Sequence, residues 1–317
     1  MFLTEANVLQ YLVRRGFARY DTVTDGSFAV RNLSRRNRNY RVCMGAREFL
    51  VKQAGEWHQS GRATIEREAA LCRRAHTDAA FEPLRRLLPA THSYDPRNSI
   101  LIFDFLAGAS VAGPEHGTMI GTAMAEFHRA MSVAALAEQF PADPPGVLLL
   151  HRWPDRAAGS DGHRELLRLV RRHEAFAAAL DGLRAKWRAT ALVHNDWKAE
   201  NCLMRDDGFF VVDWEMAGWG DPLWDAATFV QSLWNRWVRD PDECSLEEIR
   251  PGLQAFFAAY AADAGEVIAF AGARMLQSAW EALQLSAHME GDAVRLVQAS
   301  LNILTRPEWA REQLLGR

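Results

Sequence analysis

The segment "ALVHNDWKAEN", Ala191–Asn201, places a cluster of polar side chains directly behind a short apolar run. The first three residues, Ala191 to Val193, read as a buried strand because they are apolar and end at a polar loop. The loop then carries His194, Asp196, Lys198 and Asn201. One short loop thus offers a carboxylate and a carboxamide in the spacing D-x-x-x-x-N.

A further acidic position lies at the end of the next predicted hairpin. The runs "CLMR" and "FFVVDW" predict two strands, and the intervening Asp206-Asp207-Gly208 contains a D-G pair typical of a tight turn. Asp213 ends the second strand, so it can meet Asp196 and Asn201 at one mouth. Phosphoryl transfer from a nucleotide needs a carboxylate that orients the attacking hydroxyl, and oxygen ligands for Mg²⁺ on the phosphates. The pattern offers both and predicts kinase chemistry.

Composition favours an ordinary globular protein. The chain has 317 residues, of which 49% are hydrophobic and 24% charged, and a formal net charge of -3. That charge argues against a nucleic-acid or membrane-surface binder. The N-terminus lacks a signal-peptide pattern, no apolar run reaches about 18 residues, and the four cysteines form no C-x-x-C pair. We therefore expect a cytoplasmic protein with reduced thiols and neither nucleic acid nor membrane as partner.

Two kinds of pattern divide the chain near residue 105. Up to that point, short strand-like pieces such as "NYRVCM", "EFLVKQ" and "SILIFDF" surround one helix predicted over about Arg62–Ala75. Beyond it, helical periods dominate, with Ser245-x-x-Glu248 as a capping box and a long helix over about Glu266–Met289. We expect an α+β fold with a sheet-rich lobe over residues 1–105 and a mostly helical lobe over 106–317.

The motifs resemble one family. The run "VHNDWKAENCLM", followed by "VVDWEMAGWGDPLWDAA", resembles the catalytic loop and metal-binding segment of the aminoglycoside phosphotransferase and choline kinase group, relatives of the protein kinases. "FLVKQ" is similar to the strand that carries the kinase lysine, "EREAAL" to the ion-pairing helix, and "ILIFDFLAG" to the hinge. The resemblance reaches to about residue 230 and implies a two-lobed protein kinase-like fold.

The resemblance implies a role for each matching residue of the catalytic segment. Asp196 would accept or orient the acceptor hydroxyl, and Asn201 and Asp213 would hold Mg²⁺. His194 would brace the loop from behind. Asp225 would be a structural acid of the family.

The resemblance also implies an ATP site in the sheet-rich lobe. Lys52 would contact the nucleotide phosphates and pair with Glu68, although Glu66 stays open as the alternative partner. Asn39 matches the end of the phosphate loop in relatives. The hinge that would meet adenine consists of Asp104, Phe105 and Leu106.

Three features depart from the small-molecule kinases of this group. Asn195 stands where Gly usually precedes the catalytic Asp. Lys198 is typical of Ser/Thr protein kinases, where such a lysine meets the transferring phosphate; the alternative is a solvent-facing loop lysine. The loop "RNLSRRNRNYR", Arg31–Arg41, has five arginines and no glycine where a glycine-rich phosphate loop is expected, so Arg35 would act through its side chain. A solvated basic hairpin is the other interpretation of this loop.

The acceptor stays open at this point. Lys198 and the Arg-rich loop also resemble the kinase-like proteins of lanthipeptide and related peptide pathways, which implies a Ser/Thr hydroxyl of a precursor peptide as acceptor and a partner lyase. The alternatives are a small-molecule kinase for an aminoglycoside, choline or similar alcohol, and a non-catalytic scaffold that binds a peptide or partner. The missing glycines favour the scaffold, whereas the intact Asp196, Asn201 and Asp213 oppose it.

Overall fold

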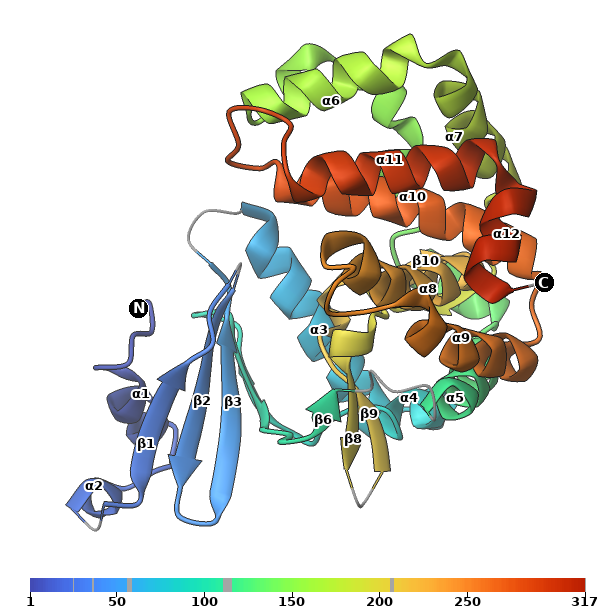
Figure 1. Ribbon diagram of the computed structural model, residues 1–317. Helices are drawn as coiled ribbons and strands as arrows, with labels where there is room; N and C mark the ends of the chain where they lie inside the picture. Colours follow the sequence, from blue (N-terminus) through green and yellow to red (C-terminus); the bar gives the residue numbers. More distant parts are fainter. Residues whose placement is uncertain (25, 36, 56–58, 111–115, 206–207, 317) are drawn as a thin grey trace. The chain divides into compact units, whose positions relative to one another are not determined.

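The computed structural model describes residues 1–24, 26–35, 37–55, 59–110, 116–205 and 208–316. The chain forms two compact units (Figure 1). Unit one comprises Met1–Ala109 and Cys202–Met216, and unit two comprises Ser110–Asn201 and Ala217–Arg317. The sequence-based division at residue 105 therefore differs in one respect, because the segment 202–216 belongs with the first part of the chain.

Unit one is built on a five-stranded antiparallel sheet in the order β1-β2-β3-β5-β4. Burial alternates along β2, where Tyr40, Val42 and Met44 are buried, so one face of the sheet covers a core. The short helix α1 (Val8–Arg14) adds Val8 and Leu12 to that core. The strands are β1 (Phe28–Asn32), β2 (Arg38–Met44), β3 (Arg47–Gln53), β4 (Thr91–Asp95) and β5 (Ile100–Asp104).

The long helix α3 (Gln59–Thr77) contacts β5 and the short 3-10 turn η7 (Trp214–Met216). A hairpin of β8 (Cys202–Arg205) and β9 (Gly208–Val211) leads into η7. The predicted pair of strands is thus present, while Asp206 and Asp207 of its turn lie outside the described residues. The N–H of Val211 donates to the carbonyl of Leu87 at 2.8 Å, which ties the hairpin to unit one. The remaining short elements of unit one are α2 (Asp21–Thr24), α4 (Glu82–Arg85) and β6 (Ala109–Ser110), the last at its boundary.

Unit two is mostly helical. Its two short strands β7 and β10 pair antiparallel, and α10 and α11 run side by side (Figure 1). Most residues of α10 are buried, as expected for a helix that is apolar on nearly all sides. The elements are α5 (Gly117–Ala130), α6 (Asp161–Arg172), α7 (Glu174–Lys186), β7 (Ala191–Val193), β10 (Gly218–Gly220), α8 (Pro222–Arg239), α9 (Leu246–Tyr260), α10 (Ala264–Ala282), α11 (Asp292–Thr305) and α12 (Pro307–Leu315).

Two glycines let α5 and α9 approach closely. A Cβ at Gly117 would lie 2.1 Å from the carbonyl oxygen of Gly252, and one at Gly121 would lie 2.7 Å from that of Phe256. Any larger residue at either position would push the helices apart.

The predicted helix boundaries hold in one case and fail in another. Ser245 and Glu248 form the expected capping box at the start of α9. The helix predicted to reach Met289 ends instead at Ala282, because the chain turns there toward α6: the hydroxyl of Ser160 donates to the carbonyl of Leu283, and the N–H of Gly162 donates to that of Ser286. No helix in the described part of the chain is both long and apolar enough to span a membrane.

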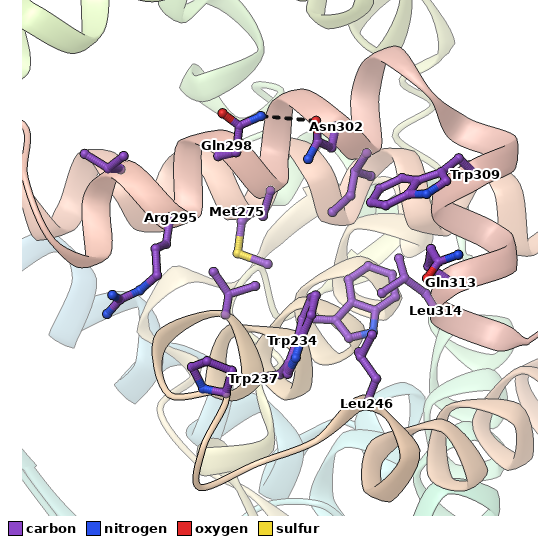
Figure 2. A pocket seen from close by; sticks show the side chains of 15 residues that line it. Trp234, Trp237, Leu246, Met275, Arg295, Gln298, Asn302, Trp309, Gln313 and Leu314 are labelled. Carbon is purple, nitrogen blue, oxygen red and sulfur yellow. Dashed lines mark hydrogen bonds between the residues drawn. The ribbon is translucent and has the colours of Figure 1, made fainter.

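Unit two also contains an apolar cavity of about 570 Å³ that is partly open to solvent. Figure 2 shows Trp309 of α12 and the amide side chains of Gln298 and Asn302 of α11 at its wall, with Gln298 donating to Asn302 at 3.2 Å. Met275 of α10 and Trp234 of α8 also line this cavity.

Candidate active site

One candidate cluster, in unit one, surrounds Lys52, which lies on β3 between β2 and β5. Its side chain is only 4% exposed. Its Nζ lies 2.7 Å from Glu68 Oε2 and 2.9 Å from Glu215 Oε2, and it also donates to Asp213 Oδ1. One buried ammonium thus contacts three carboxylates, all within unit one.

The three carboxylates come from two parts of the chain. Glu68 lies on the buried face of α3 with Ile65, Ala69 and Cys72, whereas Glu66 points to solvent. The structure therefore pairs Lys52 with Glu68, the partner preferred from the sequence.

The segment after β9 supplies the other two carboxylates. Asp213 adopts a left-handed backbone with φ of 71°. The next residue, Trp214, donates its N–H to Glu68 Oε1 at 3.0 Å. Glu215 accepts the side-chain amide of Asn37 at 2.5 Å, and its backbone carbonyl accepts Arg67 Nη1 at 3.2 Å.

Charge and burial shift the pKa values of this cluster. Burial alone would lower the pKa of Lys52, but the charges of Glu68, Asp213 and Glu215 raise it above its ordinary value. Burial raises the pKa of Glu68 to about 7, and the two other carboxylates add to the rise while Lys52 opposes it. Three carboxylates around one ammonium leave an excess of negative charge.

That excess fits a divalent cation. Ligand oxygens of Glu68, Asp213 and Glu215 all lie within 4.8 Å of one another. Carboxylate oxygens are the donors that Mg²⁺ prefers. Glu215 was missed from the sequence, although its D-x-E spacing after Asp213 could have indicated it.

The Arg-rich loop before β2 uses its own backbone donors internally. The N–H of Leu33 donates to the carbonyl of Asn39, that of Ser34 to Asn32 Oδ1, and that of Arg35 to the carbonyl of Asn37. These groups cannot cradle a phosphate as a glycine-rich loop does. Arg35 is exposed, and Arg36 lies outside the described residues.

Among the described residues, Asn39 and the hinge keep polar groups that have no hydrogen-bond partner. Asn39 lies opposite Lys52 in the β2–β3 register, and its Oδ1 is buried with no hydrogen-bond partner among the described residues. The N–H of Asp104 donates to Ala90 and that of Phe105 to Glu48, both to carbonyl oxygens. Within the described ranges the N–H of Leu106 has no such partner.

A second candidate cluster is the loop Ala191–Asn201 in unit two, which Asp225 of α8 supports through backbone hydrogen bonds. The carboxylate of Asp225 is fully buried and accepts the N–H of His194 at 2.7 Å and that of Asn195 at 2.8 Å. His128 Nε2 lies 3.1 Å from the same carboxylate. His194 is fully buried, and its Nδ1 accepts the N–H of Asp196 at 3.2 Å. These contacts agree with the bracing role predicted for His194.

The backbone conformation at position 195 suits an asparagine. Asn195 has φ of 66°, in the left-handed region. After Gly, Asn is among the residues that adopt this region most readily.

Asp196 is contacted on both carboxylate oxygens. Lys198 Nζ donates to Oδ2 at 2.7 Å, and Arg274 Nη2 of α10 donates to Oδ1 at 2.8 Å. Asn201 Nδ2 donates to the carbonyl of Asp196 at 2.8 Å and lies 3.3 Å from Oδ2. The structure thus brings Asp196, Lys198 and Asn201 together in unit two, and Asp213 with Lys52 and Glu68 in unit one. Arg274 was missed because one arginine in a helical pattern gives no sign of its partner.

A model of the phosphotransferase enzyme family matches residues 29–276. The chain belongs to this family. Protein LicA of Haemophilus influenzae is 50% identical over 38 residues, a match that spans 12% of this chain and 14% of LicA.

Solved structures of kinases share the fold of this phosphotransferase family chain. A choline/ethanolamine kinase family protein from Mesorhizobium loti covers 97% of the chain and 98% of its own length, at 17% identity and a TM-score of 0.56. An ethanolamine kinase from Plasmodium vivax covers 99% and 92%, at 12% identity and a TM-score of 0.61. Choline kinase LicA from Streptococcus pneumoniae covers 93% and 98%, at 12% identity and a TM-score of 0.59. The predicted α+β, kinase-like fold is confirmed.

The first prediction concerns the support of the loop. Asp225→Asn replaces one carboxylate oxygen with an NH₂ group, which cannot accept a hydrogen bond. Only one oxygen then remains for the backbone N–H groups of His194 and Asn195. We expect the free energy of unfolding, measured by urea denaturation, to fall by about 2 kcal/mol or more. Asp143→Asn, at an exposed position, is the control. Equal stability of the two variants would contradict the role assigned to Asp225.

The second prediction concerns pH. From the ordinary carboxyl value of 4.5 up to about 7, the folded chain binds more protons at Glu68 than the unfolded chain does. The free energy of unfolding contributed by Glu68 should therefore decrease as pH rises through this window. Glu68→Gln should flatten that dependence in denaturation experiments without added Mg²⁺.

The exposed neighbour on the same helix provides the matched control for that experiment. Glu66→Gln should keep the wild-type pH dependence, because this carboxyl is exposed. Identical slopes in the wild type and Glu68→Gln would show that Glu68 titrates normally.

Proposed function

We propose that this chain transfers the γ-phosphate of ATP to a hydroxyl group of a small molecule. The observation that carries the proposal is Asp196, a partly exposed carboxylate on a loop whose backbone is fixed by the buried Asp225. Membership of the phosphotransferase family supports the reaction class.

In this proposal Asp196 orients the acceptor hydroxyl and takes its proton. The acceptor oxygen bonds to the γ-phosphorus, and the bond from that phosphorus to the β,γ-bridging oxygen breaks, so that ADP leaves with the electron pair. Lys198 then meets the transferring phosphoryl group as a compact positive charge.

Unit one would bind the nucleotide. Lys52 meets its phosphates, Asn39 and Arg35 offer further polar contacts, and the hinge Asp104–Leu106 meets adenine through the N–H of Leu106. Asp213 would hold Mg²⁺ together with Asn201, and the contacts of Glu215 support adding it to this set. When bound, Mg²⁺ neutralises negative charge on the phosphates. Solved family structures bound to ADP and AMP support an adenine nucleotide.

A small acceptor is favoured over a peptide by two observations. The named neighbours act on small alcohols: choline, ethanolamine and, for one bacterial-microcompartment kinase, aminopropanol. The cavity of about 570 Å³ in unit two has a size typical of small-molecule sites. The precursor peptide and the partner lyase have no comparable support. Use of ATP suits a cytoplasmic reaction.

The third prediction separates a kinase from a non-catalytic scaffold. Mg-ATP should raise the melting temperature of the wild type, and Asp213→Asn should abolish that gain because it removes a charged oxygen ligand. Asp242→Asn, at an exposed position of unit two, should keep the gain. A wild type without any shift would favour the scaffold.

The fourth prediction tests the base and the acceptor together. ADP release should be measured with choline, ethanolamine, aminopropanol, an aminoglycoside and a Ser/Thr-containing peptide. We expect one of the small alcohols to raise the rate. Asp196→Asn should lower that rate by about 100-fold or more while Mg-ATP still raises its melting temperature. Stimulation by the peptide alone would replace the small-molecule acceptor with a peptide, and an active Asp196→Asn would remove Asp196 from its role.

A further inference from the structure

The two cations on Asp196 are placed differently. The Arg274 side chain, on Oδ1, is 7% exposed, whereas the Lys198 side chain, on Oδ2, is 35% exposed. Both belong to unit two, as does Asp196. One carboxylate oxygen is therefore held from within the helical core and the other from the solvent side.

Arg274 is a buried charged residue on a largely apolar helix. Its neighbours on α10 are buried and largely apolar, and a charged group in such a place is unfavourable unless it is paired. Its Nη1 lies 3.3 Å from Glu281 Oε1, but its buried Nε has no hydrogen-bond partner among the described residues. A guanidinium whose hydrogen bonds are incompletely satisfied contributes little to the stability of α10. We therefore look for a functional reason for its contact with Asp196.

The chemistry of the two side chains suggests a division of labour. A guanidinium is planar and keeps a fixed arrangement of donors, whereas an ammonium is a point charge on a flexible stem. Lys198 can swing away from Oδ2 when a substrate arrives, while the buried Arg274 keeps its contact with Oδ1.

We propose that Arg274 is a positioning residue that holds Oδ1 of Asp196, so that Oδ2 is the atom that receives the acceptor proton. This inference rests on the proposed function. The proton passes from the acceptor hydroxyl to Oδ2 as the acceptor oxygen bonds to the γ-phosphorus and ADP leaves. Without Arg274, the carboxylate can rotate and present either oxygen at the wrong distance.

The test uses the full chain and Mg-ATP with water as the acceptor, so the natural alcohol need not be known. Arg274→Lys keeps the positive charge, but the lysine side chain ends in a single nitrogen. It cannot reproduce the two separate contacts that Nη2 and Nη1 of Arg274 make with Asp196 and Glu281. We expect kcat for ATP hydrolysis to fall about 100-fold, since a misplaced catalytic group loses about that much. The KM for Mg-ATP and the binding of Mg-ADP should stay at the wild-type values.

Chemical rescue distinguishes positioning from folding. Guanidinium at a non-denaturing concentration should restore part of kcat to Arg274→Ala and should restore none to Lys198→Ala. Arg171→Lys, which changes an arginine paired with Asp155 on the surface of α6, is the matched control and should hydrolyse ATP like the wild type.

Two outcomes would overturn the inference. A wild type that hydrolyses Mg-ATP, with an Arg274→Lys variant within about twofold of its kcat, would remove Arg274 alone and leave the proposed function standing. A wild type that neither binds nor hydrolyses Mg-ATP would remove the proposed function itself, and this inference with it. The Arg274→Lys result decides the matter even if Arg274→Ala does not fold.

Discussion

The ammonium of Lys52, buried among three carboxylates, is the interaction on which the arrangement of unit one depends. A charge in the protein interior is strongly unfavourable unless opposite charges and hydrogen bonds compensate it. The compensation for Lys52 of β3 comes from helix α3, through Glu68, and from the segment after the β8–β9 hairpin, through Asp213 and Glu215. These elements are far apart in sequence, so the ammonium fixes their positions together. The same cluster has more negative than positive charge, which prepares it for a cation.

A second buried polar network, around Asp225, fixes the loop before Asp196 in unit two. Asp225 accepts two backbone N–H groups of the loop before Asp196 and contacts His128, whose Nδ1 lies 2.9 Å from the hydroxyl of Tyr260. The loop therefore keeps its strained residue, Asn195, without a glycine. Under the proposed function, the network around Lys52 belongs to the nucleotide site of unit one, and the network around Asp225 supports the loop that carries the base, Asp196, in unit two.

The sequence predicted the parts of this arrangement that depend on local spacing. Asp196, Asn201 and Asp213 follow strands at fixed offsets, and the helical period of α3 separates a buried Glu68 from an exposed Glu66. Contacts that depend on tertiary packing could not be predicted in this way. Arg274 lies 78 residues from Asp196, and its apolar neighbours on α10 indicate burial but not which carboxylate it contacts. The early end of α10 has the same origin, since contacts of Leu283 and Ser286 with α6 override a continuous helical pattern.

Lys198 shows why one motif residue does not identify the acceptor. Its position after Asp196 is typical of protein kinases, and from the sequence it favoured a peptide hydroxyl. In the structure its ammonium donates to Asp196 itself, whose other carboxylate oxygen accepts from Arg274, so Lys198 forms part of a local charge balance around Asp196. That balance concerns the proton and the transferring phosphate, which are common to peptide and small-molecule acceptors. The identity of the acceptor depends instead on surfaces that contact its non-reacting part. Under the proposed function, the apolar cavity of unit two, whose lining includes Met275, is the candidate for that surface.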